Sequence, residues 1–414
     1  MAKNKIFVSL DVGSSKIATI FADIDETGTM YVIGLGESQS KGIDKGNIIS
    51  SADAIKSIKE SISLGEAAAG FKVNGIFINI GGHHVESKKE KESITFSMPN
   101  KEIDQDDVNA LIEKINSKYK NESTTILHII PTKYILDDED LVYDPIGLIG
   151  NKLTGEFTVI TIKSSAYNNL KKVVESVGIR VLDLAVNPIA SATSVLYPEE
   201  KELGVALIDI GGGLSDIAIY KNGSLEMLKS IPIGGHLITK DIAYRFKISR
   251  ELAETIKIQY GLATLDYLDV DDHIDIPSRE GDENIRIDRK DLVETIEWRL
   301  REIFEILKKE LEKSGFYDKL TSGIVLTGGV SNTPYIKELA EEIFEKDVRI
   351  GRPKDFKCFT EKLYSPQYAT GVGVLQFLLN SLEKREITYN SKEKSSINFE
   401  DFINKFINKL KELF

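Results

Sequence analysis

The pattern of apolar and polar residues contains one arrangement twice. In the first copy, an apolar segment at 8–12 leads through small polar residues into an alternating run at 17–22. In the second copy, the segment 206–210 leads through a glycine-rich turn into the run 217–220. Each copy then has a short turn, at 26–28 and at 221–223, before a further strand. This pattern predicts two related units of three strands, in two lobes that face each other.

The first turn of each unit has the composition of a phosphate-binding loop. One turn carries Asp11, Gly13, Ser14, Ser15 and Lys16, and the other carries Asp209, Gly211, Gly212 and Gly213. Because glycine has no side chain, backbone N–H groups can approach phosphate oxygens closely, and the serines and the lysine add donors and charge. The aspartates are expected at the ends of buried strands, where a phosphate-bound magnesium ion, through its waters, would compensate them. The alternative is that each Asp-x-Gly segment is an ordinary hairpin turn without a ligand. Two copies in matching strand contexts make this alternative less favoured.

Two other segments extend this expected nucleotide site. An apolar strand at 323–327 is followed by Gly328 and Gly329 and by a helix expected at 335–344. Paired glycines there would let a base or ribose lie against bare backbone. Upstream, Glu254 and Lys257 stand three residues apart on one helical face. They form either a solvated ion pair or contacts to the hydroxyls and ring edge of adenosine.

Together these motifs resemble those of the superfamily of actin, DnaK-type chaperones and sugar kinases. Over nearly its full length the chain resembles the FtsA family of bacterial division proteins, with supporting stretches at 41–46, 187–192, 234–242 and 367–373. The resemblance implies an α/β, actin-like (ribonuclease H-like) fold of two lobes, with an inserted α+β subdomain and a C-terminal amphipathic helix. It also implies ATP and Mg²⁺ as cofactors, and it adds Gly234 and Gly235 to the nucleotide-binding residues.

One position departs from several relatives and bears on ATP hydrolysis. Those relatives carry a glutamate before the proline of the segment that corresponds to 187–192, where it can help to position water. Asn187 stands there in this chain and cannot act as a base. The resemblance therefore implies ATP binding with at most slow hydrolysis, and the sequence singles out no catalytic residue.

The order of expected elements divides the chain into lobes and modules. Lobe I is expected at 1–82 and again at 166–200, and lobe II at 201–380 with an insertion at about 240–320. Residues 83–165 are expected to form an inserted module with a helix at 106–119 and strands at 126–130, 133–136 and 157–163. The resemblance implies that the module is the IC subdomain of FtsA and that the insertion in lobe II is subdomain IIB. His83 and His84 are expected at the surface of the module boundary.

Composition narrows the class of protein. The net charge of −12, without a basic stripe, argues against nucleic acid as the main partner. The single cysteine, Cys358, excludes an internal disulfide and suits a reducing cytoplasm. The sequence contains no run of about eighteen apolar residues, so no segment is expected to span a membrane.

The last residues carry a separate signal. A polar, mixed-charge stretch at 381–397 is expected to be a flexible linker, and residues 398–414 are expected to form an amphipathic helix. The large apolar side chains of this helix fall on one stripe, made of Phe399, Phe402, Ile403, Phe406, Ile407, Leu410, Leu413 and Phe414. Such a helix can dock onto a protein, but its phenylalanines and the lysines opposite them favour a shallow membrane anchor.

The resemblance also implies partners. A member of the FtsA family would attach the FtsZ ring to the cytoplasmic side of the cell membrane at the division septum, as a peripheral protein that assembles into filaments and meets other division proteins. Residues 288–301 resemble the helix that receives the C-terminal peptide of FtsZ, with Arg299 matching best and Lys290 and Arg301 as weaker candidates. A solvated helix with internal ion pairs is the alternative for each charge. A PilM-type actin homologue of pilus assembly, and less so a sugar kinase, are alternative functions.

Overall fold

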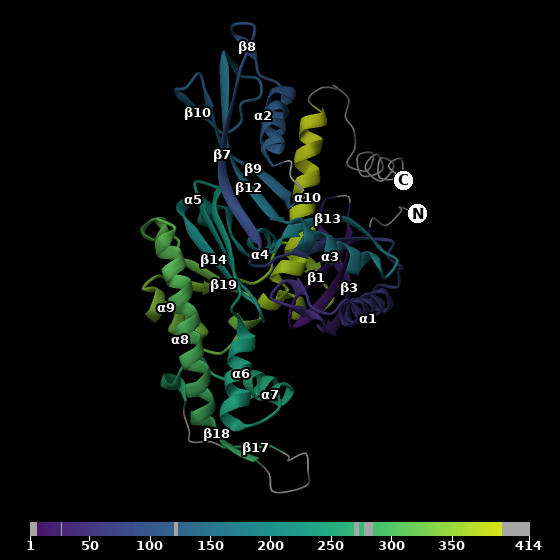
Figure 1. Cartoon of the computed structure of the whole chain (residues 1–414), viewed down its shortest axis with the longest axis vertical. Coiled ribbons are helices and arrows are strands. Elements are labelled where there is room, and N and C mark those ends of the chain that lie inside the picture. Colours follow the sequence, from purple (N-terminus) through teal and green to yellow (C-terminus); the bar gives the residue numbers. More distant parts are fainter. Residues whose placement is uncertain (1–5, 26, 120–122, 269–272, 277–284, 391–414) are drawn as a thin grey trace.

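The computed structural model describes residues 6–25, 27–119, 123–268, 273–276 and 285–390. Two lobes, each with one large mixed sheet, make up most of the molecule, and a third sheet with its own helix projects at one end of the long axis (Figure 1).

Lobe I is built on a six-stranded sheet in the order β13-β6-β1-β2-β3-β21. Its strands are β1 (Ile6–Val12), β2 (Lys16–Ile24), β3 (Met30–Gln39), β6 (Gly75–Ile80), β13 (Arg180–Val186) and β21 (Lys357–Cys358). Strands β1 to β3 are antiparallel, whereas β6 is parallel to β1 and β13 is parallel to β6. A short pair, β4 (Ile43–Asp44) and β5 (Asn47–Ile48), follows the predicted first unit of three strands.

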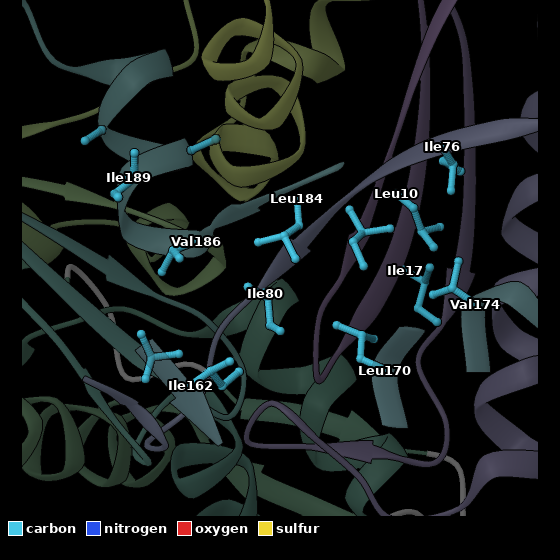
Figure 2. Close-up of a cluster of buried hydrophobic side chains, with 14 of the residues drawn as sticks. Leu10, Ile17, Ile76, Ile80, Ile162, Leu170, Val174, Leu184, Val186 and Ile189 are labelled. Atoms are coloured by element: carbon cyan, nitrogen blue, oxygen red, sulfur yellow. The ribbon is translucent and has the colours of Figure 1, made fainter. Parts of the chain in front are cut away.

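Helices cover both faces of the lobe I sheet. They are α1 (Ser51–Ala69), α3 (Ser164–Glu175), α4 (Asn187–Val195) and α10 (Ala369–Asn390). In β2, Ile17 and Phe21 pack in one cluster with α1 and α3, and Figure 2 shows part of that cluster. Ala18 and Ile20 pack in a second cluster with α10. Because neighbouring side chains of a strand point to opposite faces, burial on both sides explains the nearly continuous apolar run at 17–22.

The inserted module is an antiparallel sheet with one helix. The sheet has the order β10-β9-β12-β7, from β7 (Val85–Thr95), β9 (Thr124–Leu136), β10 (Asp140–Val142) and β12 (Lys152–Lys163). The helix is α2 (Gln105–Lys118), capped by Asp104, and it packs Val108 and Leu111 against Phe157 of β12. A two-stranded ladder of β8 (Lys101–Glu102) and β11 (Ile149–Gly150) completes the module.

Two expectations for the module are wrong. The strands predicted at 126–130 and 133–136 are one strand, β9, because Pro131 lies at a shift in the register with β12 and does not end the strand. His84 is buried, whereas His83 is exposed as expected. The ring of His84 lies over Gly82, whose missing side chain leaves the space for it.

Lobe II repeats the plan of lobe I. Its sheet has the order β16-β15-β14-β19-β20, from β14 (Val205–Ile210), β15 (Ser215–Lys221), β16 (Ser224–Ile231), β19 (Ile324–Thr327) and β20 (Val348–Ile350). Its helices are α5 (Pro198–Leu203), α6 (Gly235–Phe246), α7 (Arg250–Tyr260), α8 (Arg289–Lys313) and α9 (Ile336–Phe344), with a hairpin of β17 (His273–Ile276) and β18 (Ile285–Asp288). Strand β19 is parallel to β14, as β6 is to β1. The predicted repeat of two related units is confirmed.

The inserted module also contacts lobe II. The hydroxyl of Ser87 in β7 donates to the carbonyl of Leu228 in β16 at 3.0 Å, and the Thr158 hydroxyl donates to the carbonyl of Leu225 at 3.1 Å. The amine of Lys89 donates to that same Leu225 carbonyl and pairs with Glu226 at 3.1 Å. Strand β16 is the edge of its sheet, so the module covers the outer side of lobe II.

The end of the described chain differs from the expected linker. Helix α10 extends to Asn390, so residues 381–390 are helical where the sequence was expected to be flexible. These residues contain no glycine or proline and several good helix formers, which allows the helix to continue. The remainder of the expected linker and the amphipathic helix at 398–414 lie outside the described residues. Within the described ranges, no helix is both long and apolar enough to cross a membrane.

Candidate nucleotide-binding site

A cavity of about 160 Å³ lies between the lobes where the two Asp-x-Gly turns meet. Most of the residues expected to hold nucleotide or magnesium line it, namely Asp11, Gly13, Ser14, Ser15, Lys16, Asp209, Gly211, Gly212, Gly213, Gly328 and Gly329. Five polar residues that the sequence did not single out as ligands also line it, namely Asn79, Asn187, Asp216, Gln367 and Thr370. The fold therefore brings both halves of the expected site together.

The two turns have the same local structure. The Gly13 N–H donates to the Lys16 carbonyl at 3.1 Å, and the Gly211 N–H donates to the Leu214 carbonyl at 2.9 Å. In each unit this bond closes the turn between the first and second strands.

The turns also touch each other. Ser15 Oγ of lobe I lies 2.9 Å from His236 Nε2 of lobe II. A Cβ atom at Gly212 would lie 1.9 Å from Ser15 Oγ, so this approach requires glycine.

Three carboxylates are buried in the cleft. Burial raises the pKa of Asp11 to about 7, against the lowering effect of the Lys16 charge. Burial also raises the pKa of Asp209, and hydrogen bonds from Ser191 and Thr370 oppose this rise. For Asp216, burial raises the pKa to about 7, in part offset by a hydrogen bond from Ser230 and increased by the Asp209 charge.

Neutral donors hold these carboxylates in place. Ser191 donates to Asp209 at 2.5 Å, and Thr370 donates to the same oxygen at 3.2 Å. Asn79 donates to Asp11 at 2.8 Å, and Asn187 donates to Asp216 at 3.3 Å. Among the described residues, no three acidic, histidine or cysteine side chains are grouped to hold a metal ion. Magnesium in nucleotide sites commonly takes one or two carboxylates and completes its shell with water and phosphate.

Replacing Asp216 by asparagine is expected to stabilise the ligand-free protein more at about pH 8 than at about pH 5.5, by roughly 2 kcal/mol. A carboxyl with a raised pKa keeps its proton in the folded protein while the unfolded chain has released it. Its stabilising contribution is full below the unfolded pKa and is lost as the pH rises through about 7. Urea unfolding at both pH values measures the difference, and the exposed Asp275→Asn change on β17 is the control. Equal stability differences at both pH values would contradict the raised pKa of Asp216 in the folded protein.

Lys16 lies at the edge of the cleft. Its amine lies 3.6 Å from Glu37 Oε1 and over the ring of Tyr368, and it has no hydrogen-bond partner among the described residues. Burial lowers the pKa of Lys16 to about 8, although the Asp11 and Glu37 charges favour its protonated form. Its expected place on the terminal phosphate stays a prediction.

The remaining nucleotide-binding candidates lie beside the cavity rather than in its lining. The Gly235 N–H donates to the Gly211 carbonyl at 3.0 Å, and Gly234 packs against the same turn. Glu254 and Lys257 on α7 form an ion pair at 2.6 Å.

Gly328 has a φ of +87°, and a Cβ atom there would lie 2.3 Å from Asp209 Oδ1. Glycine at this position therefore allows the loop after β19 to reach the carboxylate.

The expected partner residues lie on α8 of lobe II. Arg299 pairs with Asp241 of α6 at 2.5 Å and with Glu302. Arg301 pairs with Glu297 and Glu342, each at 2.8 Å, whereas Lys290 is exposed near the start of the helix.

Two aromatic residues near Arg299 were missed by the sequence reasoning. Tyr244 of α6 is 87% exposed and Trp298 of α8 is 63% exposed, and the Arg245 guanidinium lies 5.7 Å from the Trp298 ring. An aromatic residue at an otherwise polar helix position was the available signal.

Comparison with known proteins identifies the family. The family described as "Cell division protein FtsA" matches residues 206–373, and "SHS2 domain inserted in FTSA" matches residues 82–161. The chain is 34% identical to the cell division protein FtsA of Pseudomonas aeruginosa over 374 residues, which cover 90% of this chain and 89% of that protein. It is 35% identical to the FtsA of Borreliella burgdorferi over 402 residues, which cover 96% of this chain and 97% of that protein. The chain belongs to the FtsA family.

Solved structures with the same architecture support the actin-like fold of this FtsA-family chain. A PilM–PilN complex of type IV pilus biogenesis aligns with a TM-score of 0.63 at 15% identity, over 90% of this chain and 98% of that chain. MreB5 of Spiroplasma citri bound to ADP aligns with a TM-score of 0.53 at 14% identity, over 94% of this chain and 99% of that chain. At these identities the likeness concerns the fold alone. Membership of the FtsA family therefore decides against the pilus-assembly and sugar kinase alternatives.

Proposed function

We propose that this FtsA-family protein binds Mg²⁺-ATP between its lobes, assembles into filaments at the cytoplasmic side of the cell membrane, and holds the FtsZ ring there. The observation that carries the proposal is the internal repeat, which sets two glycine turns against each other beside three buried carboxylates.

The residues of the cleft fit a magnesium-bound polyphosphate. The two turns supply backbone N–H groups and serine hydroxyls for phosphate oxygens, and Lys16 supplies a positive charge. Asp11 and Asp209 would hold the magnesium ion through its waters, and the charge of the ion would offset the cost of their burial. Gly328 and Gly329, with Glu254 and Lys257 nearby, form the adenosine side. Bound magnesium would neutralise phosphate charge in the site.

Nucleotide binding is expected to move the turns apart. The cavity of about 160 Å³ is smaller than the roughly 300 Å³ at which small-molecule sites begin. Ser15, which lines the cavity, also contacts His236 of the other lobe. A polyphosphate between the turns would therefore open this contact and change the angle between the lobes.

Hydrolysis in this site is expected to be slow. Asn187 begins α4 at the edge of the cavity, and its amide contacts Asn79 and Asp216. An amide cannot take a proton from water, so this position supplies no general base.

The two ends of the molecule have the surfaces that a head-to-tail filament needs. The tip of the inserted module exposes Met98, Leu141, Tyr143 and Ile149, beside four acidic residues at 137–140. Helices α6 and α7, in the half of the molecule away from the inserted module (Figure 1), expose Tyr244 and Ile258, with Lys240, Lys247 and Arg250. Apolar ends of opposite charge favour association of one copy with the next, and a contact between unlike ends produces an open filament.

The surface shared by α6 and α8 is the proposed site for the C-terminal peptide of FtsZ. Tyr244 and Trp298 offer exposed aromatic surface for apolar anchors, and Arg299 lies on the same pair of helices. A short peptide with apolar and acidic residues would find both kinds of contact there.

Arg299→Glu is expected to weaken binding of an FtsZ C-terminal peptide at least tenfold, or about 1.4 kcal/mol. The change removes the donor for an acidic side chain and places a carboxylate beside Asp241 and Glu302. Fluorescence polarisation of a labelled peptide measures the affinity, and ATP binding by the same variant should be unchanged. Lys309→Glu, an exposed position of the same helix, is the charge-matched control. Equal peptide affinity for Arg299→Glu and wild type would remove Arg299 from the site.

The experiment that tests the whole proposal uses full-length protein, liposomes and Mg²⁺-ATP. Co-sedimentation is expected to show membrane binding, and electron microscopy is expected to show filaments on the vesicles. Filaments that form only in solution, or membrane-bound protein without filaments, would contradict the proposal. Omission of ATP is the control for the role of the nucleotide.

A further inference from the structure

Asn79 is a buried amide at the end of β6, between carboxylates of the cleft. Strands β1 and β6 are parallel and pair Ser9 with Phe77 and Leu10 with Ile78, so the next residues, Asp11 and Asn79, lie side by side. Asn79 is only 2% exposed. Such a polar side chain in an apolar strand requires partners, and its contacts show what it does.

The contacts of Asn79 fix which way its amide points. The Val12 N–H donates to the side chain at 2.6 Å, so the atom there is the oxygen. The Nδ2 group then donates to Asp11 Oδ1 at 2.8 Å and to Asn187 Oδ1 at 3.1 Å. An amide nitrogen has two hydrogens, and both have an acceptor. The orientation of Asn79 is therefore determined on every side.

Asn187 continues the chain of donors into lobe II. Its Oδ1 accepts from Asn79, and its Nδ2 donates to Asp216 Oδ2 at 3.3 Å. Gly81 leaves room for this contact, because a Cβ atom there would lie 2.2 Å from Asn187 Nδ2. The other oxygen of Asp216 accepts from Ser230. A path of hydrogen bonds thus joins Asp11 in lobe I to Asp216 in lobe II.

We propose that Asn79 is the positioning residue of the magnesium site, an inference that rests on the proposed binding of Mg²⁺-ATP. Its amide donates a hydrogen bond to Oδ1 of Asp11. The other oxygen, Oδ2, takes part in no hydrogen bond among the described residues. The free oxygen is then oriented toward the water shell of the ion. Through Asn187 the same amide sets the place of Asp216, so both carboxylates are aligned only while the lobes keep this arrangement.

Asn79→Leu tests this role with little change in shape. Leucine removes the donor to Asp11 and keeps the branched side chain. Asn79→Asp is unsuitable, because the new carboxyl and that of Asp11 would lie side by side and buried. They would share a proton, and that proton would restore a hydrogen bond to Asp11. Calorimetry measures ATP affinity with Mg²⁺ and with EDTA, and the ratio of the two affinities is the quantity of interest. Asn109→Leu, at an exposed position of α2, is the control for the same substitution.

The expected result is a loss of at least tenfold in the affinity ratio for Asn79→Leu, since hydrogen bonds to charged groups are worth about that much. Affinity in EDTA is expected to fall less than affinity with Mg²⁺, because leucine leaves the Val12 N–H without its acceptor but removes no group of the two glycine turns. An unchanged ratio in folded Asn79→Leu overturns the inference, as do equal losses with and without Mg²⁺. If Asn79→Leu does not fold, Asn79→Ala decides in the same way, since it removes the same donor to Asp11 without adding apolar volume. A wild-type protein whose ATP affinity is independent of Mg²⁺ would instead overturn the proposed magnesium site itself.

Discussion

Asp209→Asn is expected to lower the Mg²⁺-dependent affinity for ATP at least tenfold, about 1.4 kcal/mol, while the protein stays folded. The asparagine oxygen can still accept from Ser191 and Thr370, so the local structure is kept. What the change removes is the negative charge beside the proposed magnesium ion. Because this carboxylate is buried, its interaction with a cation is screened little by solvent.

Calorimetry with Mg²⁺ gives the affinity, and thermal unfolding shows whether the variant is folded. Asp275→Asn, an exposed position of β17, is the matched control and should bind as wild type does. Burial raises the pKa of Asp209, so the neutral variant is expected to be no less stable than wild type in the absence of ligand. An affinity equal to that of wild type would remove the second turn from the magnesium site.

Phe406→Glu is expected to release the full-length protein from liposomes, with nucleotide binding unchanged. Phe406 lies in the middle of the apolar stripe predicted at 398–414. Full burial of a large apolar side chain is worth roughly 1.5–3 kcal/mol, and a charged residue there also resists burial in the lipid interface. A filament of the kind proposed would present many tails, and its avidity would exceed the affinity of one tail by about 10² or more. The loss should therefore be larger for filaments than for single molecules.

Liposome co-sedimentation with and without ATP measures this loss. Asn404→Glu adds the same charge on the polar side of the predicted helix and is expected to leave membrane binding intact. If Phe406→Glu, or deletion of residues 398–414, leaves co-sedimentation unchanged, the tail is not the membrane anchor.

The sequence was sufficient for the parts of the fold that local patterns determine. The repeated Asp-x-Gly turns predicted the two units of β1–β3 and β14–β16, because apolar strands and glycine turns leave a periodic record. The helix expected at 106–119 is present as α2, Gln105–Lys118. Pro131 was misleading, because a shift in register accommodates it within a strand.

Other features depend on pairing between distant segments and leave no local pattern. Asn79 and Asp216 look like isolated polar residues in apolar strands, and only the register of β1 with β6 and of β14 with β15 places them in the cleft. Ser15 and His236 are 221 positions apart and meet because the lobes face each other. His84 is buried because a glycine two positions earlier leaves space for its ring.

The contact between the inserted module and β16 has a consequence for solubility. An edge strand with free carbonyl groups is a template on which another chain can add a strand, and proteins protect such edges in order to avoid aggregation. Here the carbonyls of Leu225 and Leu228 are occupied by side chains of Lys89, Thr158 and Ser87 from the module. Strand β7 is itself at the edge of its sheet, and it carries lysines and glutamates between residues 86 and 92. Charged side chains on an edge strand disfavour the addition of a further strand there. The module thus protects the sheet of lobe II against uncontrolled strand addition.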